Sequence, residues 1–205
     1  MKKLTHRDAL LREGLRVVHQ QGYSATSVRD IVEAAGAPQG SFTNHFTNKE
    51  AFGLEILDVF YEPIRQLMAD TLLNNALSPL KRLQQWAETG IHCLNQNGEW
   101  DGCLLGNYAG EANAAIDSIQ LRLTAIFKEQ QKNISYCLKA AVKAGELPAS
   151  TRCDELALFI HSAFEGSLLI AKAQRSSKPT ESFLATLFGT VLPALQGATA
   201  PRSRS

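Results

Sequence analysis

A short stretch near the N-terminus, GAPQGSFTNHFTNKEAF, gathers side chains whose chemistry suits the recognition of nucleic acid. The amides of Gln39 and Asn44 can donate and accept together, which matches the edge of an adenine in a major groove. His45 and Lys49 carry nitrogen donors of the kind that backbone phosphates attract. These residue types indicate binding rather than bond-making chemistry, if the chain presents them on one surface.

Glycine and proline divide this region into short predicted helices. They run over about residues 5–21 with Thr5 as cap, 27–36 with Ser27 and Asp30 as a capping pair, and 38–46. Gly36 supplies the turn between the last two, because a Cβ would disfavour a left-handed backbone there. Apolar residues fall where the second and third helices must pack on the first, namely Ile31, Ala35 and Phe42. The outer face is left to Gln39, Ser41, Thr43 and Asn44. This is the helix-turn-helix pattern.

Helical signals continue along the rest of the chain. The predicted helices run over about 49–73 with Asn48 as cap, 78–95, 103–114, 117–144, 153–174 and 180–195 with Thr180 as cap. Pro63 lies inside the fourth and should kink it, because proline removes a ladder hydrogen bond. The predicted fold is all-α, with about nine helices, and the tail at 198–205 is predicted to be disordered.

Composition narrows the possible functions. The 205 residues are 44% hydrophobic and 20% charged with a net charge of +1, so any attraction for nucleic acid must be local. No apolar run reaches a membrane span of roughly 18 residues, and charges interrupt a signal peptide, which predicts a cytoplasmic protein without a membrane partner. The four cysteines show no CxxC pairing and no metal spacing, so we expect no metal, disulfide framework or cofactor.

From Thr26 to Phe52 the sequence TSVRDIVEAAGAPQGSFTNHFTNKEAF closely resembles the N-terminal signature of TetR-family transcriptional regulators. The matching positions are Asp30, Ile31, Ala35, Gly36, Gly40, Phe42, His45, Phe46, Lys49 and Glu50. The resemblance implies a ligand-responsive regulator, most simply a repressor, that binds a palindromic double-stranded operator as a homodimer. It also implies a helix-turn-helix domain at 1–48, an effector-binding and dimerisation domain at 49–197, and a tail at 198–205.

The residues expected to contact DNA follow from chemistry and from the motif. They are Ser27, Arg29, Gln39, Gly40, Ser41, Thr43, Asn44, His45 and Lys49. Phe42 and Phe46 are expected in the core, and Lys2, Lys3 and Arg7 form either a basic arm or a solvated terminus. Thr43 stands where the family usually has Tyr, so one phosphate contact has a shorter reach. Gln39 stands where Lys is frequent, which favours adenine over guanine.

The second domain supplies candidates for a small, partly apolar effector and for a dimer seam. The effector candidates are Phe60, Trp86, His92, Trp100, Cys103, Asn107, Tyr108, Phe127, His161 and Phe164, with Met68 beside them, although each also suits a plain core. The seam candidates are Phe159, Ala163, Phe183, Leu187, Phe188 and Val191. By the resemblance, the last two helices pair with their copies, and the helix that begins at Lys49 transmits effector binding to the DNA.

Cys103 can be interpreted in two ways. A helix N-terminus favours a thiolate, whereas the neighbouring Asp101 opposes it. The segment GCLLGN also resembles one in TetR-family repressors that sense electrophiles by cysteine modification, but free cysteines are commonly buried small hydrophobes.

Two other functions stay open. A small-molecule binding protein of the same fold that has lost DNA binding is motivated by Thr43. An enzyme using Cys103 or a histidine is the other, but no catalytic motif supports it, and we expect no enzyme.

Overall fold

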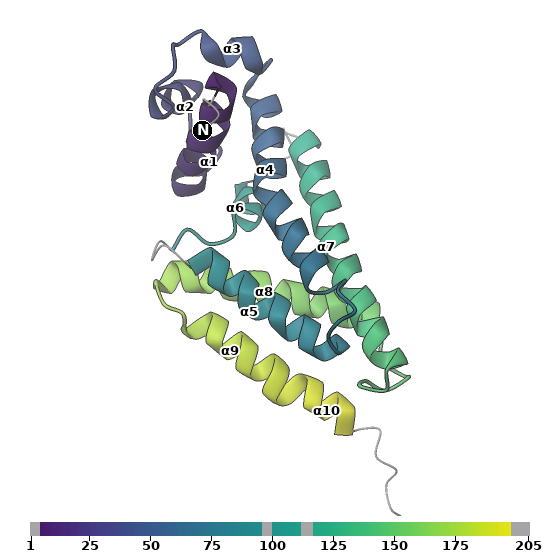
Figure 1. The fold of residues 1–205 in the computed structure, drawn as a ribbon. Helices are drawn as coiled ribbons and strands as arrows, with labels where there is room; N and C mark the ends of the chain where they lie inside the picture. Colours follow the sequence, from purple (N-terminus) through teal and green to yellow (C-terminus); the bar gives the residue numbers. More distant parts are fainter. Residues whose placement is uncertain (1–4, 96–99, 112–116, 198–205) are drawn as a thin grey trace, which may run out of the picture. The chain divides into compact units, whose positions relative to one another are not determined.

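A computed structural model describes residues 5–95, 100–111 and 117–197, and these residues form helices joined by turns, without a strand. The elements are α1 (His6–Gln21), α2 (Val28–Ala34), α3 (Ser41–His45), α4 (Lys49–Asp70), α5 (Pro79–Asn95), α6 (Leu104–Glu111), α7 (Asp117–Lys143), α8 (Cys153–Gln174), α9 (Lys178–Thr186), a π turn η1 (Leu187–Val191) and α10 (Leu192–Gly197). Because α9, η1 and α10 follow one another without a break, the predicted all-α fold of about nine helices is confirmed (Figure 1).

Capping residues fix where the first helices begin. The Thr5 hydroxyl accepts from the Asp8 amide at 3.1 Å, and the Asp8 carboxylate accepts from the Thr5 amide at 3.2 Å. Ser27 and Asp30 form the same reciprocal box at the start of α2. Such boxes satisfy the amides that a helix N-terminus leaves open. The predicted capping roles of Thr5 and Ser27 are therefore confirmed.

Three predicted boundaries differ from the structure. Residues 38–41 form a turn, in which the Ser41 amide donates to the Pro38 carbonyl at 2.8 Å, so α3 begins at Ser41 rather than at Pro38. The α4 helix ends at Asp70, three residues before the predicted end. The last helix begins at Lys178, and Thr180 is buried inside its first turn, where its hydroxyl donates to the Ser177 carbonyl at 2.8 Å. Thr180 is therefore not the cap that the sequence predicted.

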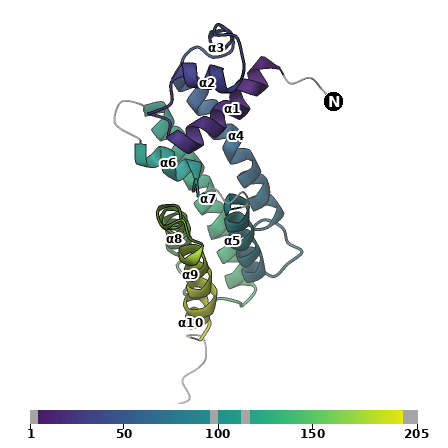
Figure 2. The same cartoon turned by 90° about the vertical axis from the view of Figure 1, so that its left-hand side faces the viewer.

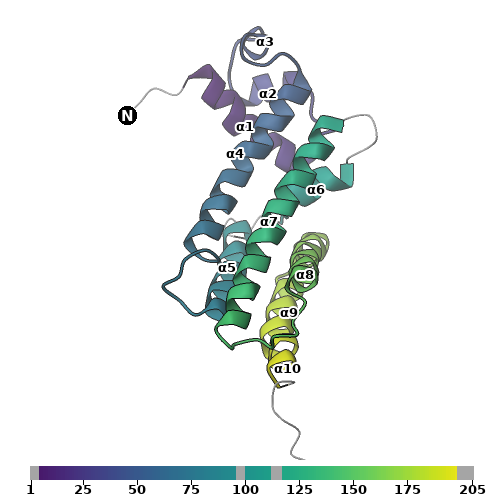
Figure 3. The ribbon, with the colours of Figure 1, turned by 90° about the vertical axis from the view of Figure 1, so that its right-hand side faces the viewer.

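Contacts divide the chain into two compact units. The first unit comprises Met1–Pro63 and Cys103–Ile126, and the second comprises Ile64–Gly102 and Phe127–Ser205. Both α4 and α7 contribute to each unit, and the two helices lie side by side (Figure 3). Ion pairs join them within the first unit (Asp58 with Arg122) and within the second (Arg65 with Glu129). The functional boundary predicted at residue 48 stays a prediction, and the tail at 198–205 with Lys2 and Lys3 lies outside the described residues.

The first unit has an aromatic core under its helix-turn-helix. The rings of Phe42, Phe46 and Phe52 lie with centroids 5.1–5.5 Å apart, and each residue is at most 2% exposed. Gly14 lets α1 approach this core, because a Cβ there would lie 2.4 Å from the Phe52 ring. The core position predicted for Phe42 and Phe46 is confirmed, and it fixes α3 against α1 and α4.

The second unit is built around α8, which packs against α9 (Figure 2). The α8 helix has two apolar faces. One face is buried and contains Ile160, Phe164 and Leu168. The other is exposed and contains Phe159, Leu169 and Ile170. Among the described residues, α8 is the helix whose length and apolar composition would suffice to cross a membrane, but the core helix of a non-membrane protein meets the same criteria.

Candidate functional site

The turn between α2 and α3 holds the candidate DNA-binding surface. The α2 helix ends in a Schellman motif, in which the Gly36 amide donates to the Glu33 carbonyl at 3.1 Å and the Ala37 amide to the Val32 carbonyl at 3.2 Å. Gly36 has φ +58°, and no atom lies within 4 Å of where its Cβ would be. The glycine is therefore needed for the backbone conformation rather than for space.

The structure places most of the predicted contact residues on the surface. Those exposed are Ser27, Arg29, Gln39, Gly40, Thr43, Asn44 and His45. Ser41 is only 8% exposed, so the outer-face position predicted for it is wrong: it is the first residue of α3, and its side chain turns into the unit. Arg29 and Gln39 line a common groove of about 370 Å³ together with Gly36 and Ala37. The α2 helix and the turn thus present one surface.

Several of these side chains already have protein partners. The Arg29 guanidinium donates to the Glu33 carboxylate at 2.7 Å, one helical turn away. The Thr43 hydroxyl donates to the Gly40 carbonyl at 3.0 Å. A phosphate contact by Thr43 would therefore use its proton in place of this bond, because a hydroxyl has a single proton to donate.

Lys49 begins α4 but lies against an aromatic ring. Its ammonium nitrogen is 4.4 Å from the centroid of the Tyr23 ring, which is cation–π geometry. Partial burial lowers the pKa of Lys49, while the charges of Glu111 and Asp30 raise it. Lys49 follows directly on the helix-turn-helix. Its ammonium group contacts the loop between α1 and α2 through the Tyr23 ring.

That loop is fixed by a carboxylate from α6. Glu111 accepts hydrogen bonds from the backbone amides of Tyr23 at 3.2 Å and Ser24 at 2.6 Å. Gly22 precedes them with φ +91°, and a Cβ there would lie 2.5 Å from a Glu111 oxygen. The Tyr108 ring from α6 lies 5.0 Å from the Tyr23 ring. We call the contact of Glu111 with the two amides the α6 clamp.

The α6 clamp could not have been found from sequence. Glu111 and Tyr23 are 88 residues apart, and neither belongs to a recognisable motif. The crowding at Gly22 is also visible only in three dimensions. Tyr108 was predicted to contact an effector, but it is 2% exposed and packs on Tyr23. Burial raises the pKa of Tyr108, so its hydroxyl stays protonated.

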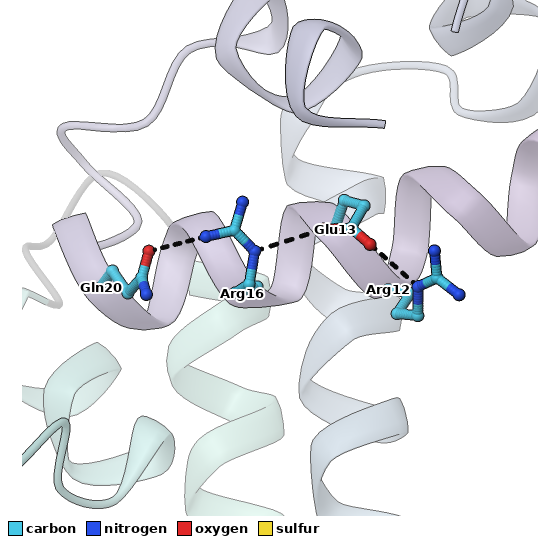
Figure 4. A network of polar contacts seen from close by, with 4 residues as sticks. All are labelled: Arg12, Glu13, Arg16 and Gln20. Carbon is cyan, nitrogen blue, oxygen red and sulfur yellow. Dashed lines mark hydrogen bonds and ion pairs between the residues drawn. The ribbon is translucent and has the colours of Figure 1, made fainter. Parts of the chain in front are cut away.

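A column of acidic, basic and amide side chains follows the outer face of α1 (Figure 4). Glu13 accepts from Arg12 at 2.9 Å and from Arg16 at 3.2 Å, and Arg16 also donates to Gln20 at 3.0 Å. The hydrogen bonds from Arg16 and Arg12 lower the pKa of Glu13, and the bond from Arg16 has the larger effect. Both arginines are engaged with Glu13, so their charge is partly neutralised at this part of the α1 surface.

The effector candidates fall into both units. Phe60, Cys103, Asn107 and Tyr108 belong to the first, and Trp86, His92, Trp100, Phe127, His161 and Phe164 to the second. Within the second unit, the Trp86 and Phe164 rings lie 4.9 Å apart, and the Phe127 and His161 rings 5.5 Å apart. His92 is exposed. The structure thus brings four of these residues together in two ring pairs, with His161 and Phe164 on consecutive turns of α8.

Cys103 lies immediately before α6. Its carbonyl accepts from the Asn107 amide at 3.0 Å, and the residue is 5% exposed. The thiol is therefore protected from solvent in this conformation. No three histidine, cysteine, aspartate or glutamate side chains lie close enough to hold a metal ion within the described part of the chain.

The candidate seam residues meet along one side of α8 and α9. A groove of about 440 Å³ is lined by Phe159, Ala163, Gly166, Ser167, Ile170, Pro179, Ser182, Phe183, Thr186, Leu187 and Val191. It contains five of the six predicted seam residues, and Phe188 is half-buried. Phe159 is 54% exposed and Ile170 48%. An apolar surface of this kind on a helix pair is typical of an interaction site.

These features define an all-α protein with a helix-turn-helix in one unit and an apolar helix pair in the other. The chain matches the family described as "Bacterial regulatory proteins, tetR family" over residues 10–56. It also matches "Tetracyclin repressor-like, C-terminal domain" over residues 79–187. The chain therefore belongs to the TetR family. Members of this family are DNA-binding transcriptional regulators and not enzymes. This agrees with the predicted regulator function and with the expectation that the protein is not an enzyme.

Individual relatives agree with this assignment. The HTH-type transcriptional repressor DhaR of Mycobacterium sp. (strain GP1) is 32% identical to this chain, and the match covers 96% of this chain and 97% of the DhaR chain. The transcriptional regulator AcuR of Cereibacter sphaeroides is 32% identical over 87% of this chain and 81% of its own. The crystal structure of a TetR regulatory protein from Rhodobacter sphaeroides superimposes with a TM-score of 0.83 and 31% identity, covering 90% of this chain and 97% of that one.

Proposed function

We propose that this protein is a transcriptional repressor that binds a palindromic operator as a homodimer and leaves it when a small molecule binds. The observation that carries the proposal is the exposed polar surface of α2 and α3, held on an aromatic core. Two relatives are described as HTH-type transcriptional repressors, DhaR and the NemR protein of Escherichia coli, at 32% and 26% identity. A cytoplasmic location follows from this role, because the DNA is there.

Within this proposal the DNA contacts divide by chemistry. Gln39 and Asn44 contact base edges, and Gly40 lets the backbone approach them. The phosphates are held by Ser27, Arg29, Thr43, His45 and Lys49. Ser41 can contribute through its backbone but not through its buried side chain.

The homodimer forms through α8 and α9. The groove along these helices and the exposed Phe159 and Ile170 present apolar surface on one side. A second copy would cover this surface with the same residues, because a two-fold interface joins identical patches. Two helix-turn-helix units then read two half-sites, which gives the affinity that a single unit lacks.

Release of the DNA requires that the effector bind the two states of the protein with different affinity. We propose that the effector binds in the second unit near Trp86, Phe127, His161 and Phe164. The α4 helix carries the change, since it begins at Lys49 and continues past Pro63 into the second unit. The α6 clamp on the loop after α1 is a second connection that acts within the first unit.

Modification of Cys103 is the alternative trigger. Because Cys103 is buried, a reagent can reach its thiol only after the start of α6 moves. Unchanged derepression and unchanged alkylation after Cys103→Ser would remove this alternative.

Fluorescence anisotropy with labelled upstream intergenic DNA tests the main proposal. We expect tight binding that weakens as salt is raised, because phosphate contacts release counterions. Binding without salt dependence, or no binding at low salt, would contradict it.

The second candidate is a small-molecule binding protein that no longer binds DNA, which Thr43 in place of tyrosine favours. The comparison of the native chain with Thr43→Tyr distinguishes the two. A change from no binding to tight binding would support the second candidate, whereas tight binding by the native chain supports the repressor.

A further inference from the structure

Two polar side chains lie deep in the second unit, and each has one nitrogen atom without a hydrogen-bond partner. Gln130 on α7 is 3% exposed and His161 on α8 is 4% exposed. Within the described residues, the Nε2 atom of each is buried and has no hydrogen-bond partner. Buried polar groups in proteins are nearly always hydrogen-bonded, so each exception calls for an explanation.

The contacts of His161 show which kind of partner its free nitrogen needs. The Gln131 amide nitrogen lies 3.4 Å from His161 Nδ1. An amide NH₂ group only donates, so we assign Nδ1 as the acceptor and place the ring proton on Nε2. Nε2 lies 4.0 Å from a Glu165 oxygen, which is beyond hydrogen-bond distance. His161 Nε2 and Gln130 Nε2 are therefore both donors without an acceptor.

The His161 donor belongs to a ring in aromatic surroundings, and Gln130 is on the neighbouring turn of α7. Phe127 packs edge-on against the His161 ring at 5.5 Å, and Gln130 follows Phe127 by one helical turn on α7. Phe164 follows His161 by one turn on α8 and lies 4.9 Å from Trp86. A molecule held here would offer hydrogen-bond acceptors to the donors and apolar surface to the rings.

Charge argues against an anionic molecule. Burial lowers the pKa of His161 to about 4, so the imidazole is neutral at ordinary pH. The Glu165 carboxylate faces the imidazole from one turn along α8, and it would repel a second negative charge. On α7, Lys128 and Lys132 are exposed to solvent on the opposite side from the buried Gln130. A neutral acceptor oxygen suits this site better than a carboxylate or a phosphate.

We propose that Gln130 and His161 form the recognition site for the oxygen of a neutral carbonyl compound with an apolar or aromatic body. The proposal rests on the proposed function in one respect only, which is that this compound is the effector. Neither donor has an acceptor within the described protein, and the bound compound supplies one. The two polar side chains thus make the site selective for the ligand, but they lower the stability of the ligand-free protein.

Stability of the free protein gives the first test. Gln130→Leu keeps the size of the side chain but removes the unpaired amide, so we expect the melting temperature to rise by about 3 °C. Ser135→Ala is the control on the same helix, because Ser135 is 4% exposed and its hydroxyl donates to Asp154 at 2.5 Å. The control should lower the melting temperature. A fall for Gln130→Leu as well would overturn the proposal.

Three matched probes give the second test, with thermal stabilisation and tryptophan fluorescence as readouts. Acetophenone carries a neutral carbonyl, ethylbenzene lacks the oxygen, and benzoate is anionic. We expect acetophenone to bind about a hundredfold more tightly than ethylbenzene and more tightly than benzoate. Gln130→Leu and His161→Leu should each lose about tenfold, since one hydrogen bond of this kind is worth roughly tenfold. Equal binding of acetophenone and ethylbenzene, or stronger binding of benzoate, would overturn the proposal.

DNA binding is measured separately, so that the two hypotheses can fail independently. Gln130→Leu should bind operator DNA as the native chain does. If acetophenone binds as expected but leaves DNA affinity unchanged, the carbonyl site stands and its assignment to the effector is wrong. If the native chain does not bind DNA, the repressor proposal fails, and the probe series still decides whether the carbonyl site exists.

Discussion

His161 makes the stability of the protein depend on pH at the scale of one residue. Its pKa is lowered to about 4 by burial, whereas an unfolded histidine titrates near 6.5. Between these values the unfolded chain binds a proton that the folded chain does not. Stability is therefore fully present above about pH 6.5 and falls progressively as the pH is lowered towards 4.

We expect His161→Leu to remove this pH dependence. Urea unfolding of the native chain should lose up to roughly 1.4 kcal/mol per pH unit more than the variant across this window. The difference between the two curves isolates His161 from other titrating groups, including the nearby Glu165. Parallel curves would show that the ring is accessible to protons in the folded state.

The two glycines that flank the helices of the first unit provide a second test at this scale. Gly22 and Gly36 both have positive φ, but only Gly22 is crowded, since its Cβ would lie 2.5 Å from Glu111. Gly36→Ala should cost about 1–2 kcal/mol for its backbone conformation alone. Gly22→Ala should cost at least about 1 kcal/mol more, because its φ of +91° with ψ 153° lies in a region essentially restricted to glycine and the carboxylate must also move. Denaturant unfolding of both variants measures the difference, and equal values would contradict a tight α6 clamp.

At the scale of elements, α6 is the helix that connects the middle of the sequence to the helix-turn-helix. Its Glu111 carboxylate accepts from two amides of the loop after α1. Hydrogen bonds to a charged acceptor are about twice as strong as neutral ones. The position of α6 and the position of this loop are therefore coupled within the first unit.

Glu111→Gln should weaken this coupling while it keeps the shape of the side chain. We expect the amides of Tyr23 and Ser24 to exchange with solvent about tenfold faster, which hydrogen exchange measures, and DNA affinity to fall. Glu88→Gln is the control, since Glu88 accepts from Gln84 on the exposed face of α5. Unchanged exchange at Tyr23 would mean that the clamp does not hold the loop in solution.

The sequence predicted the elements well where local chemistry decides them. Thr5 and Ser27 act as caps, Asn48 accepts from the Ala51 amide at 2.7 Å, and α8 has the predicted ends. The predictions from sequence failed where contacts with neighbouring residues in the fold decide the structure. Thr180 has the chemistry of a cap, but its hydroxyl is used inside a helix that begins earlier.

The candidate sites were predictable to different degrees for the same reason. The residues expected to contact DNA lie within one motif, so their spacing fixes their face. Seven of the nine are exposed, Lys49 is half-buried and Ser41 is buried, and their contact with DNA stays a prediction. Glu111 is distant in sequence from Tyr23, and no local pattern points to that contact. Gln130 is intermediate, because it falls on the apolar face of α7 between Phe127 and Ile134, and a polar residue on such a face is a signal that could have been noticed.

At the scale of the whole molecule, the proposed DNA recognition depends on a second copy. A single short helix offers too few contacts for specific binding, so two units must be held at a fixed spacing. We propose that the α8 and α9 surface holds them, because it combines a groove with exposed apolar side chains. Loss of the dimer should therefore abolish specific DNA binding while each copy of the protein stays folded.

Phe159→Asp tests this dependence. Phe159 is 54% exposed and lines the groove, so a charge there should disrupt the interface without entering the core of one copy. We expect light scattering to show a monomer and operator affinity to fall at least about a hundredfold, while circular dichroism stays helical. Leu121→Asp is the control, since Leu121 is 70% exposed on α7 and does not line the groove. A Phe159→Asp protein that remains dimeric and binds the operator normally would place the interface elsewhere.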